Sequence, residues 1–143
     1  MRSVSHREYK ATTAICGVES ADPDADIRRL ESMILSGLSY VGVRHAIAVN
    51  SGTSGLHLLV RAFGIHDGDE VITTPFSFIA SSNCILYERA KPVCVDIEWD
   101  TANIDVDLIE SAITPRTKAI LPVDAFGQPA KLDVIRVIAD PQD

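Results

Sequence analysis

The amino-acid sequence predicts an α/β protein of three layers (α/β/α), in which a mostly parallel sheet lies between helices. Short apolar runs typical of strands alternate along the 143 residues with segments whose apolar side chains recur every three or four positions. Such alternation is typical of a parallel sheet whose strands are joined by right-handed helical crossovers. The length corresponds to one domain, and the chain contains no linker and no internal repeat.

The first third of the chain is predicted to contain one helix and one strand. Residues 1–22 have weak periodicity, and we assign no element to them. Apolar side chains then recur at helical spacing behind Asp24, a suitable cap, which predicts a helix over 24–36. The short apolar run over 45–49 predicts the first strand.

A second helix is predicted directly after that strand. Its apolar face consists of Leu56, Leu59, Val60 and Phe63. Gly64 is well placed to end this helix, because glycine commonly follows a helix C-terminus. The segment from Ala48 to Ile65 is therefore predicted to form a strand, a tight turn and a helix.

The same alternation continues to the end of the sequence. Strands are predicted over 70–74, 92–97 and 118–123, and helices over 77–87, 106–113 and 132–139. Asp105 is the expected cap of the helix over 106–113. Arg116 and Lys118, at the entrance of the last strand, are expected to be solvated charges.

The composition is that of a folded globular protein. Hydrophobic residues make up 46% of the chain and charged residues 23%, which argues against disorder and low complexity. The net charge of -7 and the lack of clustered Lys and Arg disfavour nucleic-acid binding. No apolar stretch approaches the ~20 residues that cross a bilayer. We therefore expect no nucleic acid and no membrane among the partners.

The N-terminus and the cysteines bear on the compartment. The first ten residues, MRSVSHREYK, lack the apolar core of a secretory signal, which predicts a cytoplasmic protein. Cys16, Cys84 and Cys94 are odd in number and show no CxxC spacing, so neither a disulfide framework nor a metal site is expected. We expect these cysteines to be buried free thiols.

A small, hydroxyl-rich turn follows the first predicted strand, with the sequence Ser51-Gly52-Thr53-Ser54-Gly55. Ligands of open α/β sheets bind beyond the carboxyl ends of strands, where the next helix begins. Free amides and the helix dipole favour an anion there; Gly52 permits close approach, and Thr53 and Ser54 add hydroxyl donors. A phosphate seat is one interpretation, and a simple helix cap by Ser51 or Thr53 is the other. Neither GxGxxG nor GxxxxGK[ST] is present.

Two aromatic residues follow the next predicted strand, in the segment Thr74-Pro75-Phe76-Ser77-Phe78. They belong to the same edge of the predicted sheet as the hydroxyl-rich turn. A flat ring beside a phosphate seat suggests a planar, phosphorylated cofactor. The alternative is that Phe76 and Phe78 simply pack in the core.

Several segments together carry a family resemblance: AVNSGTSGLHL, GDEVITTPFSFIASSN, AKPVCVDI, NIDVDLIESAITPRTKAILPV and FGQPAKLDVI. In this order they resemble the DegT/DnrJ/EryC1/StrS sugar aminotransferases, pyridoxal-phosphate enzymes of fold type I. The resemblance runs from Val41 to Ala139. It implies amino transfer from an amino acid, usually glutamate, to a keto group on a nucleotide-linked sugar. It also implies a homodimer with active sites at the subunit interface and a role in nucleotide-sugar or polysaccharide biosynthesis.

The resemblance also implies roles for particular residues. Gly52, Thr53 and Ser54 would hold the phosphate of pyridoxal 5'-phosphate, and Phe78 would stack on its pyridine ring. Asn83 and Asp96 would be structural residues near the site. His57 is expected in packing or at the surface. The segment Gly127-Gln128-Pro129 corresponds to a turn without assigned chemistry.

Residues 1–143 correspond to an incomplete large domain of such an enzyme. In this family the catalytic lysine and the acid group beside the pyridine nitrogen come later in the chain, and the four lysines here occupy neither context. We therefore predict weak cofactor binding, no catalytic residue and an inactive, truncated chain that forms homo-oligomers. One alternative is a degenerate, non-catalytic module that self-associates or binds a homologue. Another is a relative that dehydrates sugars with the same cofactor.

Overall fold

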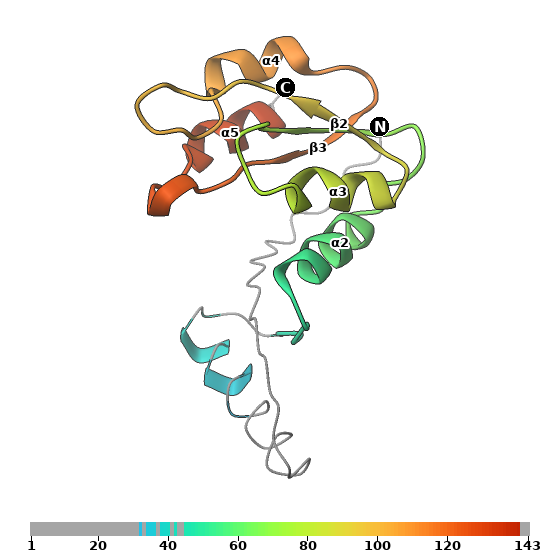
Figure 1. The fold of residues 1–143 in the computed structure, drawn as a ribbon, viewed down its shortest axis with the longest axis vertical. Coiled ribbons are helices and arrows are strands. Elements are labelled where there is room, and N and C mark those ends of the chain that lie inside the picture. Colours follow the sequence, from blue (N-terminus) through green and yellow to red (C-terminus); the bar gives the residue numbers. More distant parts are fainter. Residues whose placement is uncertain (1–31, 33, 37, 41, 43–44, 141–143) are drawn as a thin grey trace. The chain divides into compact units, whose positions relative to one another are not determined.

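The computed structural model describes residues 32, 34–36, 38–40, 42 and 45–140 (Figure 1). The chain divides between Gly55 and Leu56 into two units. In the first unit, the described residues from 32 to 40 are helical. Residues 32 and 34–36 of the helix predicted over 24–36 are therefore confirmed as helical, and residues 38–40, beyond its predicted end, are helical too. Its expected cap, Asp24, lies outside the described residues, as do segment 1–22 and Cys16.

The strand predicted over 45–49 was wrong. Residues 45–48 have no regular secondary structure, and Val49 forms only an isolated bridge. The side chain of Ile47 is 77% exposed. A strand requires a neighbour that takes up its backbone N–H and C=O groups, and residues 45–48 have no such ladder partner in the part of the chain that the structure describes. An apolar run alone therefore did not make a strand here.

The second unit contains a parallel sheet of three strands. These are β1 (Glu70–Thr73), β2 (Lys91–Cys94) and β3 (Thr117–Leu121), in the order β2-β1-β3. Both neighbours of β1 run parallel to it, which confirms the predicted sheet type. β2 ends three residues before its predicted end, because Ile97 instead forms an antiparallel bridge with Ile104.

Helices connect and cover these strands. They are α2 (Gly52–Ala62), α3 (Ala80–Tyr87), η1 (Val106–Leu108), α4 (Ile109–Ala112), η2 (Ala125–Gly127) and α5 (Leu132–Ala139). The predicted bounds were confirmed for α5, whereas the helix predicted over 77–87 starts three residues before the observed α3. The helix predicted over 106–113 is a 3-10 turn followed by one α-helical turn. Asp105 caps it as predicted, because its side chain accepts a hydrogen bond from the Asp107 amide at 3.0 Å.

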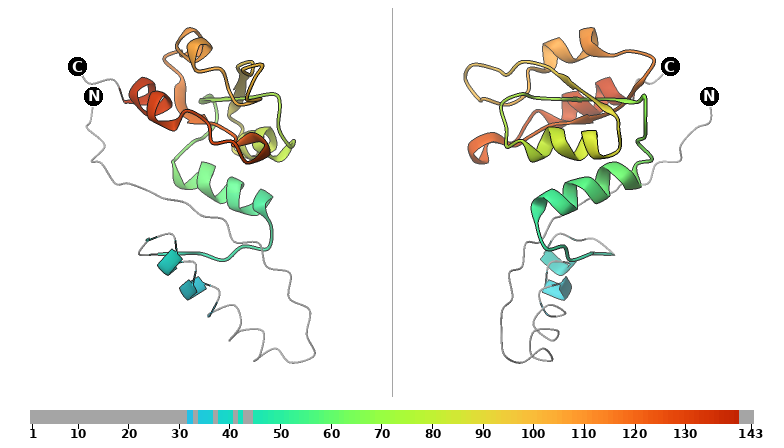
Figure 2. Two further views of the ribbon diagram at one scale, coloured as in Figure 1. Left: turned by 90° about the vertical axis from the view of Figure 1, so that its left-hand side faces the viewer. Right: turned by 45° about the vertical axis from the view of Figure 1, so that its right-hand side comes forward.

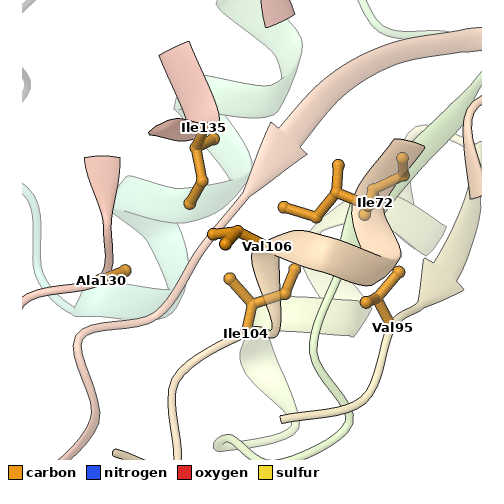
Figure 3. Packing of buried hydrophobic residues seen from close by; sticks show 7 residues of the cluster. Ile72, Val95, Ile104, Val106, Ala130 and Ile135 are labelled. Atoms are coloured by element: carbon orange, nitrogen blue, oxygen red, sulfur yellow. The ribbon is translucent and has the colours of Figure 1, made fainter. Parts of the chain in front are cut away.

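Two apolar clusters fill the two faces of the sheet. The first lies under η1, α4 and α5 and consists of Ile72, Val95, Ile104, Val106, Ile109, Ala130 and Ile135 (Figure 3). The second lies against α3 and α2 and consists of Val60, Ile65, Val71, Cys84, Ile85 and Ala90. Successive strand residues point to opposite faces, so Val71 and Ile72 enter different clusters. Helices thus cover both faces, as the three-layer prediction requires (Figure 2).

The described cysteines differ in their surroundings. Cys84 is a buried free thiol, and burial raises its pKa. Its Sγ lies 3.2 Å from the carbonyl oxygen of Ser81, to which it donates. Cys94 is free but exposed, so the prediction of burial was wrong for it. It is the last residue of β2, which among the described strands has a neighbour on one side only.

The buried carboxylate of Glu70 joins the starts of the strands. Glu70 is 2% exposed, and it accepts hydrogen bonds from Thr114 Oγ1 at 2.6 Å and from Arg116 at 2.8 Å. Lys91 Nζ donates to it at 3.3 Å. These hydrogen bonds lower the pKa of Glu70 from 4.5 to about 2. The prediction that Arg116 is only a solvated charge was therefore incomplete, because its guanidinium is exposed and also pairs with a buried acid.

We expect Glu70→Gln to remove a pH-dependent part of the stability. The pKa of Glu70 is depressed in the folded chain, so its contribution is fully present above pH 4.5 and is lost as the pH falls toward 2. The free energy of unfolding of the wild-type chain should therefore fall more steeply over this interval than that of the variant. Urea denaturation followed by circular dichroism at a series of pH values measures both slopes.

Glu110→Gln is the matched control, since Glu110 is exposed on α4. This control should reproduce the wild-type slope. Parallel curves for the wild-type and Glu70→Gln chains would contradict the assignment of the acid-sensitive stability to Glu70.

Candidate functional site

The hydroxyl-rich turn forms the start of helix α2. Ser51 is its cap, because Ser51 Oγ accepts a hydrogen bond from the Ser54 amide at 3.1 Å. The two serine hydroxyls lie 3.0 Å apart, and Ser54 Oγ donates to Asn50 Oδ1 at 2.7 Å. Of the two capping candidates, Ser51 takes this role and Thr53 does not. The turn is held in place by its own side chains.

Capping leaves part of this turn available to a ligand. The first backbone hydrogen bond of the helix runs from the Gly55 amide to the Ser51 carbonyl at 3.1 Å. The amides of Gly52 and Thr53 lie before it, and among the described residues neither has an acceptor. Both residues are partly exposed. Two free amides at the positive end of a helix suit an anion, so capping and phosphate binding are compatible here.

Phe78 lies between β1 and α3, in the second unit. Its ring is 75% exposed, so the alternative that it packs in the core was wrong. Its carbonyl oxygen accepts hydrogen bonds from the Ser81 amide and from Ser77 Oγ, both at 3.0 Å. The backbone is thereby fixed while the ring remains free to contact a ligand. Of the four predicted binding residues, Gly52, Thr53 and Ser54 share one turn in the first unit, and Phe78 belongs to the second.

A cavity of about 420 Å³ opens at the carboxyl ends of β1 and β3. The residues lining it are Pro75, Phe76, Ser77, Val123, Asp124, Ala125 and Phe126. The rings of Phe76 and Phe126 lie across from each other, with centroids 6.1 Å apart and an interplanar angle of 55°. The cavity therefore has two aromatic walls, each carried by a turn that follows a neighbouring strand.

The second wall of this cavity was missed by the sequence reasoning. Asp124 and Phe126 follow β3, the neighbour of β1, and a signal for them was present. Parallel strands bring their carboxyl ends to one edge, so a residue after β3 is as close to that edge as one after β1. Asp124 is the titratable residue among those lining the cavity, and its Oδ1 accepts a hydrogen bond from the Ala130 amide at 2.9 Å.

The remaining candidates have structural contacts. His57 Nε2 lies 2.7 Å from Glu88 Oε1, and the imidazole packs edge-on against Tyr87 at a centroid distance of 5.2 Å. This is the packing role that the sequence predicts. Asp96 accepts a hydrogen bond from the Ile97 amide at 2.8 Å and shapes the chain after β2. Asn83 lies within α3.

The described lysines lie away from the cavity lining. Lys91 pairs with Glu70 at the starts of the strands, and Lys118 is the second residue of β3. Lys131 Nζ donates to Glu98 Oε1 at 2.6 Å, which raises the pKa of Lys131 and lowers that of Glu98. Each of these positions fits the predicted surface role.

The described residues contain neither a metal-binding cluster nor a membrane-spanning helix. No three of their His, Cys, Asp and Glu side chains are grouped so that they could hold a metal ion. None of their helices has the length and apolar character needed to cross a bilayer.

An aromatic cavity beyond the carboxyl ends of parallel strands is typical of ligand-binding α/β enzymes. The model of the DegT/DnrJ/EryC1/StrS aminotransferase family matches residues 25–143. The chain belongs to this family.

Individual relatives agree with this assignment. The chain is 48% identical to the spore coat polysaccharide biosynthesis protein SpsC of Bacillus subtilis, over 71% of this chain and 26% of that protein. It is 50% identical to GDP-perosamine synthase of Caulobacter vibrioides, over 70% of this chain and 27% of the synthase. The crystal structure of NtdA from Bacillus subtilis, with bound cofactor PMP, matches with a TM-score of 0.75 and 42% identity. That match covers 77% of this chain and 25% of NtdA. The chain thus spans about a quarter of the length of these relatives.

We expect Ser51→Ala and Thr53→Ala to separate capping from anion binding. Loss of the Ser51 hydroxyl removes the cap and should lower the free energy of unfolding by about 0.5–2 kcal/mol. Loss of the Thr53 hydroxyl should leave stability nearly unchanged and weaken the binding of inorganic phosphate by about tenfold. Urea denaturation and a phosphorus NMR titration measure the two quantities. Equal phosphate affinities for the wild-type and Thr53→Ala chains would exclude a contact from this hydroxyl.

Proposed function

We propose that residues 1–143 form part of the large domain of a pyridoxal-phosphate-dependent aminotransferase that acts on a nucleotide-linked keto-sugar. The family match over residues 25–143 carries this proposal. Two relatives support the sugar substrate of this proposal, since one is a GDP-perosamine synthase and the other is a polysaccharide biosynthesis protein. NtdA, which binds PMP, supports the cofactor class.

Four residues of this chain would hold the cofactor. The amides of Gly52 and Thr53 and the hydroxyl of Thr53 would bind the phosphate, since among the described residues they have no other partner. Ser54 would contribute less than its neighbours, because its amide and its hydroxyl are both already hydrogen-bonded. The exposed ring of Phe78 would stack on the pyridine. When bound, the cofactor supplies an electron sink for amino transfer.

These contacts alone support only weak binding. A micromolar complex needs about 8 kcal/mol of net free energy, and association itself costs about 4–15 kcal/mol. Ring stacking adds about 0.5–1.5 kcal/mol beyond burial, and a helix N-terminus adds up to about 2 kcal/mol. Transamination with this cofactor requires a lysine. No described lysine lines the cavity, so the 143-residue polypeptide would not catalyse transamination by itself.

A titration of the purified 143-residue chain with pyridoxal 5'-phosphate tests this proposal. We expect affinity weaker than micromolar and no amino transfer from glutamate. Phe78→Ala should weaken binding by about two- to tenfold, because stacking is lost. Leu86→Ala is the control, since Leu86 is a half-exposed apolar residue of α3 outside the proposed site. A stoichiometric cofactor absorbance band that glutamate quenches would show that the polypeptide is active by itself.

A second candidate is a non-catalytic module that self-associates, and the edges of the sheet favour it. Within the described part of the chain, each outer strand has a neighbour on one side only. β2 contains Pro92, which lacks a donor and blunts that edge. β3 has the sequence TKAIL and contains no proline, so each of its residues keeps its backbone N–H, and its one charged residue is Lys118. An edge strand with all its donors can pair with another chain more readily than β2, so β3 is where a second copy would bind.

We expect the 143-residue chain to associate in a concentration-dependent way through β3. Sedimentation velocity over a range of concentrations would detect the oligomers. Hydrogen exchange would locate the contact, since association should protect amides of Thr117–Leu121 and leave those of Lys91–Cys94 unchanged. A compact monomer at all concentrations would exclude this candidate and leave the aminotransferase proposal standing.

A further inference from the structure

The turn after β3 presents an aromatic residue in an unfavourable backbone conformation. Phe126 has φ 52° and ψ 26°, in the left-handed region that favours glycine, and Gly127 follows with φ 82°. The Phe126 side chain is also 87% exposed. A non-glycine residue in this region costs free energy, and burial of the ring does not offset that cost here. Arg89 and Ala102 have a similar φ, but of these three residues Phe126 is the one that lines the cavity. Backbone strain clusters at ligand-binding sites, so its presence in the cavity wall points to binding.

Asn103 holds this turn on both sides of Phe126. Its side chain is 3% exposed and uses both ends of its amide. Asn103 Oδ1 accepts a hydrogen bond from the Ala125 amide at 2.8 Å, and Nδ2 donates to the Gln128 carbonyl at 2.9 Å. The residues just before Phe126 and just after Gly127 are thereby fixed.

Asn103 is itself held firmly in place. Its backbone amide donates to Thr101 Oγ1 at 3.2 Å, and its carbonyl oxygen accepts from the Glu98 amide at 2.8 Å. The next residue, Ile104, belongs to the first apolar cluster. The turn therefore has an anchor in the core of the second unit, about 25 residues earlier in the chain.

By holding the turn, Asn103 also holds the Phe126 ring in the cavity. The ring lies 6.1 Å from that of Phe76, within the range of favourable aromatic pairs. Phe76 is fixed independently, since its amide donates to Thr74 Oγ1 at 3.2 Å. Both rings line the cavity, Phe126 largely exposed and Phe76 about half exposed, so their free faces can take a further ring.

We propose that Asn103 is a positioning residue: it holds the 124–128 turn so that Phe126 faces Phe76 and the two rings bind a flat aromatic heterocycle. This rests on the proposed function for the source of the heterocycle, which is either the pyridine of the cofactor or the base of a nucleotide-linked sugar. Asn103 acts through the turn and does not itself line the cavity.

The variant Phe126→Gly distinguishes a role of Phe126 in ligand binding from a role in stability alone. Glycine adopts the left-handed conformation without strain, so this variant should unfold at a higher urea concentration than the wild-type chain. It also removes one aromatic wall and should weaken heterocycle binding by about two- to tenfold. A residue with a merely structural role would not gain stability while losing affinity.

Asn103→Ala and Asn103→Asp test the anchor. In the wild-type chain we expect NMR cross-peaks between the rings of Phe76 and Phe126. Asn103→Ala should abolish them, whereas Asn103→Asp keeps the acceptor for the Ala125 amide and should retain part of them. Ile104→Val is the control, since it removes a core methyl group next to Asn103 and should leave the cross-peaks unchanged. Cross-peaks that persist in Asn103→Ala would overturn the positioning role.

NMR titrations of the wild-type chain with pyridoxal 5'-phosphate and with GDP identify which molecule supplies the heterocycle. Shifts at Phe76 and Phe126 with pyridoxal phosphate alone assign the cofactor ring, and shifts with GDP alone assign the base. If neither ligand shifts these residues, the ligand part of the inference is overturned. The proposed function fails by a different result, in which Thr53→Ala and Phe78→Ala both leave the affinity for pyridoxal phosphate unchanged.

Discussion

The carboxylate of Glu70 holds together the starts of all three strands of the sheet. Its partners come from the segment before β3 and from the first residue of β2, while Glu70 itself begins β1. Backbone hydrogen bonds at the same edge join Glu70 to Arg116 and Lys91 to Asp69. These contacts hold the start of β1 against β2 and β3, although the register of β1 against β3 shifts between Glu70 and Val71. The buried acid therefore helps to set how the strands pair, and the turns at the carboxyl edge follow from that pairing.

The side chains at the amino ends and at the carboxyl ends of the strands have opposite effects on stability. At the amino edge the acid is buried and its oxygens are fully hydrogen-bonded, an arrangement that stabilises the fold. At the carboxyl edge Phe76, Phe78 and Phe126 are exposed, and Phe126 has a strained backbone. Exposed rings and positive φ also occur elsewhere, as at Trp99 and Arg89. Three exposed rings and a strained residue at the edge where α/β sheets bind ligands nevertheless favour a binding role for this edge.

The sequence predicted those helices and caps whose formation depends on residues close together in the chain. Helix α5 has regular apolar spacing and was predicted with its observed bounds, and Asp105 was recognised as a cap because capping acts over two residues. The strand over 45–49 failed because a strand depends on a partner that its own sequence does not specify. Asn103 and Glu70 were missed for a related reason. Their roles depend on hydrogen bonds to residues 21 to 46 positions away, which no spacing rule reveals.

The hydroxyl-rich turn shows why two interpretations of one motif need not compete. A helix begins with several amides that lack intrahelical acceptors, and a side-chain cap satisfies one of them. Ser51 takes the amide of Ser54 and leaves those of Gly52 and Thr53. The cap also orders the turn through the contacts among Ser51, Ser54 and Asn50, so the remaining amides are held ready for an anion. Capping here would favour the proposed phosphate binding, because an unordered turn would have to be fixed by the ligand at a cost in affinity.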